Sequence, residues 1–190
     1  MLTDHQIRQL CITEELLNPW SESVSGNGIV SYGLTSAGYD LRLANEIYFF
    51  KGTYGEVIDP KKFKDPDYCS RVFDVITFPD NHRVVISPHS YVLGKSVEYI
   101  RMPRWLKGQC VGKSTYARSG IIVNTTPIEN EWRGYLTIEI SNPTAFPICI
   151  YTMEGIAQLE FFPTSNPLIS YKDKNGKYQN QTGVTPSRVI

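Results

Sequence analysis

Residues 135–141, the most informative part of the chain for its fold, read Tyr-Leu-Thr-Ile-Glu-Ile-Ser. Its aliphatic side chains alternate with polar or aromatic ones, so the two sets lie on opposite faces of an extended strand. The non-aliphatic face carries Tyr135, Thr137, Glu139 and Ser141. Glu139 is therefore a candidate for acid–base chemistry, although the alternation alone would equally suit a carboxylate that faces solvent.

Similar short β-forming runs recur along the chain between Pro and Gly residues. They lie at 39–43, 47–50, 72–78, 83–87, 91–99, 109–111, 121–123, 135–141, 148–151 and 156–162. About ten short strands with this punctuation predict a β-sandwich, jelly roll or distorted barrel. Residues 21–28 read as a polar loop.

Helical periodicity is convincing only near the start, at Ile7, Leu10, Cys11, Leu16 and Leu17. There Thr3 and Thr13 are suited to cap two short helices. Inside the chain we expect one helix, a short turn at 114–118. Residues 52–70, which include Thr53-Tyr54-Gly55, are charged and predict an irregular, solvated excursion.

Length and composition limit the number of domains and the kinds of partner that the chain can have. The 190 residues suit one domain, and 19 basic and 19 acidic residues give a net charge of zero. This balance argues against a broad electrostatic surface for nucleic acid or anionic membrane. No apolar run approaches the roughly 20 residues of a spanning helix, and residues 3–6 lack the character of a secretion signal. We therefore expect a cytoplasmic protein with no nucleic-acid or membrane partner.

A second informative segment is residues 112–120. It has a glycine at each end, the cations Lys113 and Arg118, and the hydroxyls of Ser114 and Thr115. Backbone N–H groups and fixed cations on a short turn suit an oligophosphate. A purely structural turn would need the glycines but not these side chains, and the order of residues is not that of a Walker loop.

These two segments, together with residues 38–41 and 155–158, resemble the dCTP deaminases of the deoxyuridine triphosphatase superfamily. The resemblance runs from residues 1–4 to the tail motif at 176–181. It implies a single mainly β domain over 1–190, a distorted barrel or jelly roll of short strands with a short N-terminal helical segment. It also implies a homotrimer with nucleotide sites at subunit contacts. The implied reaction is hydrolytic deamination of dCTP to dUTP and ammonia, with Mg²⁺ bound through the triphosphate.

The resemblance also implies roles for individual residues. Glu139 would be the catalytic base, Arg118 would hold it ionised, and Ser114 would hold the attacking water. Lys113 and the backbone N–H groups of 114–117 would bind phosphate. The implied nucleotide contacts are Lys113, Ser114, Thr115, Tyr116, Ala117, Arg118, Thr137, Ile138, Glu139, Gln158, Tyr171, Lys177 and Gln181, and no residue is implied as a metal ligand. Asp40 is as suited to holding a turn as to meeting Mg²⁺ indirectly.

A zinc mechanism is not expected. The cysteines are far apart and form no C-x-x-C pair, so we interpret Cys11, Cys69, Cys110 and Cys149 as ordinary thiols. The histidines lie outside the H-x-E and P-C-x-x-C pattern of zinc nucleobase deaminases: His5, His82 and His89. A deaminase built from this chain must activate water without zinc.

Two alternatives stay open. In residues 124–134, Glu129 stands near the position of the water-activating Asp of the triphosphatases, and Trp132 stands at their sugar-packing Tyr. No Phe follows Phe162, whereas the triphosphatases have a tail Phe that stacks on uracil. These departures favour a deaminase, but a bifunctional enzyme that continues to dUMP and pyrophosphate remains open. The other alternative is a non-catalytic nucleotide-sensing module.

The last segment, residues 163–190, is poor in aliphatic residues and rich in Lys, Asn, Gln and Gly. It cannot form a core of its own and must lie on the rest of the protein. The resemblance favours a lid over the nucleotide, and the alternative is a frayed terminus.

Overall fold

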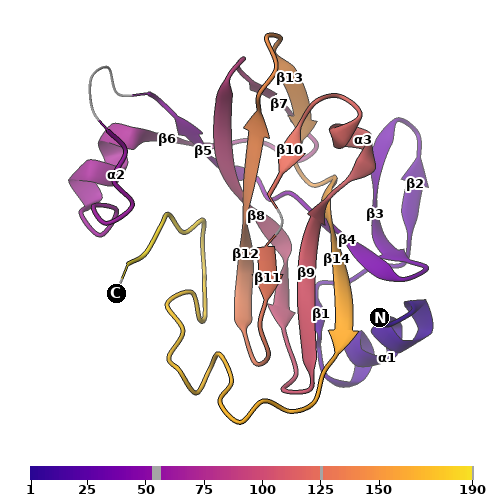
Figure 1. Cartoon of the computed structure of the whole chain (residues 1–190). Helices are drawn as coiled ribbons and strands as arrows, with labels where there is room; N and C mark the ends of the chain where they lie inside the picture. The colour runs from indigo at the N-terminus through magenta and orange to yellow at the C-terminus, as the bar shows by residue number, and fades with distance from the viewer. Residues whose placement is uncertain (53–56, 125, 190) are drawn as a thin grey trace.

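The computed structural model describes residues 1–52, 57–124 and 126–189 (Figure 1). Residues 53–56 of the predicted excursion and residue 125 of the segment 124–134 lie outside this description. The described chain begins with α1 (Asp4–Thr13), preceded by Thr3 as its N-cap. The backbone N–H of Thr3 donates to Gln6 Oε1 at 3.0 Å, an interaction typical of helix starts. Thr13 ends this same helix, so the expected second helix is wrong.

One six-stranded antiparallel sheet carries Glu139. Its order is β10 (Ile122–Val123), β12 (Arg133–Asn142), β8 (Ser90–Arg101), β5 (Glu46–Phe50) and β6 (Phe73–Thr77), with β1 (Leu17–Asn18) also paired to β8. Glu139 of β12 lies opposite Leu93 of β8. On the other side of β12, strand β10 covers only Ile140 and Ser141, which leaves the rest of that edge open to another segment.

A second six-stranded sheet has the order β11 (Thr126–Ile128), β9 (Leu106–Gly112), β14 (Gly155–Pro163), β4 (Gly38–Arg42), β3 (Ile29–Thr35) and β2 (Val24–Gly26). Strands β7 (Arg83–Ile86) and β13 (Ile148–Tyr151) form a separate pair. Across the second sheet, Ala157 of β14 lies between Leu41 of β4 and Gly112 of β9, and Gln158 lies opposite Asp40. This pairing gathers three sequence motifs at one place.

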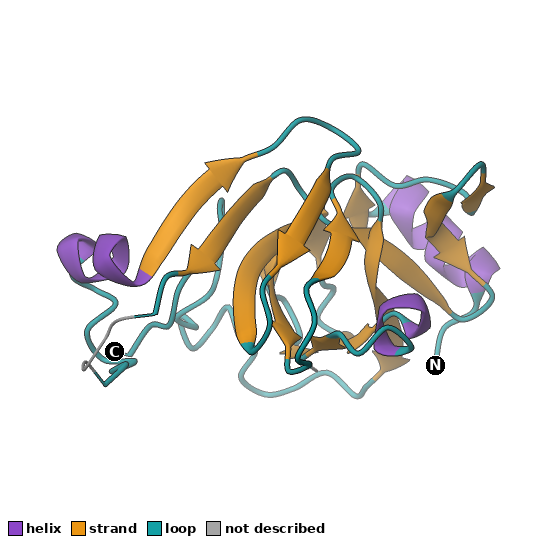
Figure 2. Ribbon diagram, turned by 90° about the horizontal axis from the view of Figure 1, so that it is seen from above, coloured by secondary structure: helices purple, strands orange, loops and turns teal. Residues whose placement is uncertain are grey.

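The two large sheets share one core (Figure 2). Leu41 and Phe161 from one sheet, and Ile47 and Ile100 from the other, are fully buried in it. The mainly β fold is confirmed, and every predicted strand segment overlaps a strand. The sequence reasoning missed β1, β2, β3 and β11. Strand β2 lies inside the predicted loop at 21–28, where ladder pairing to β3 outweighs the polar composition.

The charged excursion contains a helix that the sequence reasoning missed. Helix α2 (Pro66–Val72) begins at Asp65, whose side chain accepts the Asp67 N–H at 2.9 Å, with Pro66 at the first position. The expectation that α3 (Ser114–Ala117) is the one internal helix is therefore wrong. No helix in the described residues is long and apolar enough to cross a membrane.

Residues 164–189 form a tail without helix or named strand that runs beside β12 (Figure 1). The Asn180 N–H donates to Arg133 O at 2.8 Å, and the Tyr135 N–H donates to Gln181 O at 3.0 Å. Gln181 forms a parallel bridge with Gly134, so the tail occupies the open edge of β12. The apolar tail residue Val184 is buried against α2 and its neighbours.

Candidate active site

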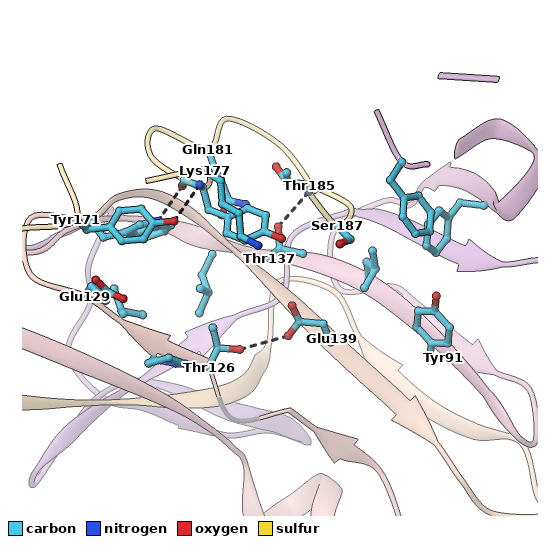
Figure 3. A pocket seen from close by; sticks show the side chains of 18 residues that line it. Tyr91, Thr126, Glu129, Thr137, Glu139, Tyr171, Lys177, Gln181, Thr185 and Ser187 are labelled. Atoms are coloured by element: carbon cyan, nitrogen blue, oxygen red, sulfur yellow. Dashed lines mark hydrogen bonds between the residues drawn. The ribbon is translucent and has the colours of Figure 1, made fainter. Parts of the chain in front are cut away.

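A cavity of about 540 Å³ opens between the first sheet, β11 and the tail (Figure 3). β12 contributes Leu136, Thr137 and Glu139, and the tail contributes Tyr171, Lys177, Tyr178 and Gln181 among others. Phe63, Phe73 and Tyr91 line it as well. Phe63 belongs to the excursion that looked merely solvated, so this segment contributes one aromatic side chain to the cavity, beside Phe73 of β6 and Tyr91 of β8.

Glu139 is the half-buried carboxylate of this cavity. Burial raises its pKa above the ordinary value. The Thr126 hydroxyl of β11 points at it and lies 3.4 Å from Oε2, a long contact that favours the ionised form only weakly. A carboxyl whose pKa is moved toward neutrality can take a proton from water and return it, as general acid–base catalysis requires.

Most of the β12 and tail residues named from the sequence line the cavity of Glu139, and Ile138 does not. Thr137, Tyr171, Lys177 and Gln181 all line the same cavity, as do Glu129 and Trp132. The Thr137 hydroxyl accepts the Thr185 N–H at 3.0 Å, which ties the tail to β12. Ile138 is buried in the core on the opposite face of β12, so its side chain does not reach the cavity.

The residues of α3 do not join this cavity within the chain. α3 and the tail lie at opposite sides of the molecule (Figures 1 and 2). Arg118 and Ser114 are exposed and line neither described cavity. The expected contact in which Arg118 holds Glu139 ionised is therefore absent within this chain, and burial raises the pKa of Glu139 instead.

The geometry around α3 also changes the predicted phosphate contacts. The Tyr116 and Ala117 N–H groups both donate to Lys113 O at 3.1 Å, so they are already used inside the turn. The Tyr116 side chain is buried, and its hydroxyl accepts the Tyr151 N–H at 3.3 Å. The side chains of Ser114, Thr115 and Arg118 remain exposed.

Lys113 and Gln158 lie neither in the cavity of Glu139 nor among the exposed side chains of α3. Lys113 Nζ is paired with the carboxylate of Asp40, and both side chains are 10% exposed. Burial raises the pKa of Asp40 even though Lys113 opposes that shift. Gln158 Nε2 donates to the Thr35 hydroxyl at 3.3 Å and does not line the cavity of Glu139. Asp40 thus holds Lys113 in place.

Sequence reasoning missed several cavity residues, above all Thr126 and Tyr178. Thr126 follows a short apolar run and carried no periodic signal. Tyr178 stands beside Lys177 in the tail motif, and its carbonyl accepts Trp132 Nε1–H at 2.8 Å. Trp132 is only 5% exposed and lines the cavity, so its hydrogen bond to Tyr178 connects the cavity lining to the tail.

A smaller cavity of about 400 Å³ adjoins the first and shares Phe63 and Lys177 with it. Its other lining residues are Lys64, Arg188 and Val189. The described lining therefore contains three cations and no acidic residue. Such a cluster suits an anionic group that extends from the larger cavity.

A family model described as dCTP deaminase-like matches residues 1–164. The chain belongs to this family. A dCTP deaminase from Nitratiruptor sp. is 46% identical over 188 residues, which are 98% of this chain and 97% of that protein. Another, from Acidobacterium capsulatum, is 45% identical over 183 residues, or 96% of this chain and 95% of that protein. The chain is an enzyme of this dCTP deaminase type.

The crystal structure of 2′-deoxycytidine 5′-triphosphate deaminase from Agrobacterium tumefaciens has the same fold, with a TM-score of 0.60 at 21% identity. The match covers 84% of this chain and 47% of that one, so the chain spans about half its length. The dCTP deaminase-like family model ends at residue 164, before the tail residues that line the cavity. The tail side of the site therefore rests on the geometry of this chain.

Proposed function

We propose that this chain catalyses zinc-independent hydrolytic deamination of dCTP to dUTP and ammonia, with Glu139 as the general base. The observation that carries the proposal is a half-buried carboxylate of raised pKa in a cavity of about 540 Å³, lined also by Tyr171, Lys177 and Gln181. We expect the enzyme to act in the cytoplasm.

The chemistry needs one group that both takes and gives protons. Glu139 takes a proton from water as the oxygen attacks C4 of cytosine, and gives that proton to ring N3. Glu139 then takes the proton of the new C4 hydroxyl and gives it to the amino nitrogen, so that the C4–N bond breaks, the C4=O bond of uracil forms, and ammonia leaves. Burial raises the pKa of Glu139, which makes its carboxylate a stronger proton acceptor toward water than an exposed glutamate is.

Different residues bind the base and the phosphates of the nucleotide. The Gln181 amide offers a donor and an acceptor, the combination needed to read the cytosine edge. Lys177 lines both cavities, so a triphosphate can extend from Glu139 toward Lys177, Lys64 and Arg188. The tail, residues 163–190, acts in this proposal as the lid over the nucleotide.

Mg²⁺ enters this scheme as part of the substrate. The described residues contain no group of three or more His, Cys, Asp and Glu side chains placed to hold a metal. A triphosphate supplies hard oxygen ligands of its own, which Mg²⁺ prefers. The metal would neutralise phosphate charge beside Lys177, and Glu139 would carry out the proton transfers at the cytosine ring.

We propose that a neighbouring copy completes the site, in a homotrimer. Ser114 and Arg118 are exposed at the side of the molecule opposite the tail, while the cavity of Glu139 has no arginine among its described lining residues. A symmetric, head-to-tail ring brings the α3 side of one copy to the tail side of the next. Ser114 could then hold the attacking water, and Arg118 could meet Glu139.

The test is a product assay. Purified protein is incubated with dCTP and Mg²⁺ after exhaustive treatment with a zinc-selective chelator, and the nucleotides, pyrophosphate and ammonia are separated. We expect dUTP and ammonia in equal amounts, at the rate of untreated enzyme. Activity that only zinc restores would overturn the zinc-independent mechanism. Binding of dCTP without any product would favour the nucleotide-sensing alternative.

A second candidate function is bifunctional conversion of dCTP to dUMP and pyrophosphate. One observation favours it: Glu129 is exposed and lines the same cavity as Glu139. If the assay yields dUMP, Glu129→Gln should suppress pyrophosphate release and let dUTP accumulate. We favour the deaminase alone, because Glu in place of Asp displaces the carboxylate, and a misplacement near 1 Å can cost about 10²-fold in rate.

A further inference from the structure

Arg104, in the turn between β8 and β9, makes contacts that the catalytic scheme does not use. Its Nη1 lies 2.7 Å from Glu131 Oε2, and its Nη2 lies 3.0 Å from Asp173 Oδ2. The same Nη2 is 3.0 Å from Pro167 O and 3.1 Å from Leu168 O. Three of these four acceptors belong to the tail, so one guanidinium ties the body of the domain to residues 167–173.

The backbone beside Arg104 joins the same arrangement. Asn130 Nδ2 donates to Arg104 O and to the Thr164 hydroxyl, both at 2.8 Å. The Tyr171 N–H donates to Asn130 O at 3.1 Å. Arg104 and Asn130 therefore bracket the tail segment that ends at Tyr171, whose ring lines the cavity of Glu139.

Hydrophobic burial holds little of this segment before Tyr171, which packs against the core. Leu168 is 97% exposed and Ile169 is 60% exposed, although both are apolar. Ordering such a segment costs chain entropy, which burial of these two side chains does not offset. Only a planar group with several donors can serve two carboxylates and two carbonyls together, and lysine cannot reproduce that geometry.

We propose that Arg104 is a positioning residue for nucleotide binding: it fixes residues 167–173 against the domain and so places Tyr171 in the cavity. Arg104 does not line that cavity and acts through the tail. The inference rests on the proposed function for the identity of the nucleotide, and on the contacts of Arg104 for the ordering of the tail.

The experiment compares Arg104→Gln, Arg104→Lys and Asp173→Asn with wild type. The matched control is Arg8→Gln, which removes an arginine of similar exposure (38% against 36%) whose carboxylate partner is Glu22, far from the tail. Two quantities are measured: hydrogen exchange of the 165–181 amides without nucleotide, and KM and kcat for dCTP.

For Arg104→Gln we expect faster exchange at Tyr171 and Gly176, and a KM raised about tenfold with kcat within about twofold. Arg104→Lys should fall between this variant and wild type, and Asp173→Asn should shift both quantities in the same direction. Arg8→Gln should change neither.

Unchanged exchange in Arg104→Gln, or faster exchange with unchanged KM, would overturn the proposal. If Arg104→Gln does not fold, Arg104→Lys and Asp173→Asn decide by the same two criteria. The exchange measurement needs no nucleotide and the product assay needs no variant, so failure of this inference and failure of the proposed function are distinguishable.

Discussion

Glu139 is a charged residue in a place that disfavours charge. Its pKa is raised by burial, and the only side-chain donor near it among the described residues is the distant Thr126 hydroxyl. Such a residue costs folding stability when ionised, which a purely structural strand position would not require. The cost makes sense if the carboxylate exchanges protons with a substrate.

Glu139→Gln should abolish turnover while leaving dCTP binding nearly intact, because the amide keeps the shape but cannot accept a proton from water. We expect kcat to fall by at least about 10². Steady-state rates and calorimetric binding check this, with Glu160→Gln of β14, which does not line the cavity, as control. Retention of a tenth or more of wild-type kcat would exclude Glu139 as the base.

The same substitution should reveal the pKa shift as a pH dependence of stability. Because the folded pKa of Glu139 lies above its ordinary value of 4.5, the folded state binds the proton more tightly than the unfolded chain does. The free energy of unfolding of wild type should therefore fall relative to Glu139→Gln as pH rises from about 4.5 through the folded pKa. Urea unfolding of both proteins at pH 4 and pH 8 measures this, and a pH-independent difference would contradict it.

At the scale of elements, the edge of β12 is shared. β10 pairs with its last residues, and the tail occupies the part near Gly134 through Gln181. Gly134 has φ of +149°, and a Cβ there would lie 2.8 Å from the backbone nitrogen of Gln181. Only glycine lets the tail approach the strand this closely.

Gly134→Ala should displace the tail and weaken dCTP binding. The control is Gly28→Ala. It places an alanine at a backbone position whose φ is +77°, but no atom lies within 4 Å of the new Cβ. Both variants should lose stability by order 1–3 kcal/mol from backbone strain. Only Gly134→Ala should raise the KM for dCTP and speed tryptic cleavage at Lys172, Lys174 and Lys177. Equal KM values in the two variants would show that the contact of the tail with β12 does not support binding.

In the whole molecule, the cavity of a single chain is lined by only some of the site residues named from the sequence. Glu139, Tyr171, Lys177 and Gln181 meet in one cavity, whereas Ser114 and Arg118 lie elsewhere. The proposed site, shared between copies in a ring, would bring these two sets of residues together.

A mixing experiment tests the shared site. Glu139→Gln and Arg118→Ala should each be inactive alone, while co-expressed or co-refolded mixtures should regain activity in about a quarter of their sites by random assembly of trimers. Activity is assayed together with the mass of the assembly by light scattering. Mixtures that stay inactive although mixed assemblies form would show that no site is built from two copies.

Features that depend on local period and composition could be predicted from the residues alone. Alternation placed Glu139 on the face of β12 opposite Ile138 and Ile140, and the tail's composition showed that it must lie on the domain. The Asp65-Pro66 start of α2 is also a capping signal that the sequence carries.

Which distant segments meet depends on long-range packing, and the folded chain was needed to see it. Folding brought Thr126 and Phe63 to Glu139, paired Lys113 with Asp40, and kept Arg118 away within the chain. Periods of about 2 or 3.6 residues fix which face a side chain occupies, not which strand or tail lies opposite that face. That choice depends on register and long-range pairing, which the whole set of strands settles together.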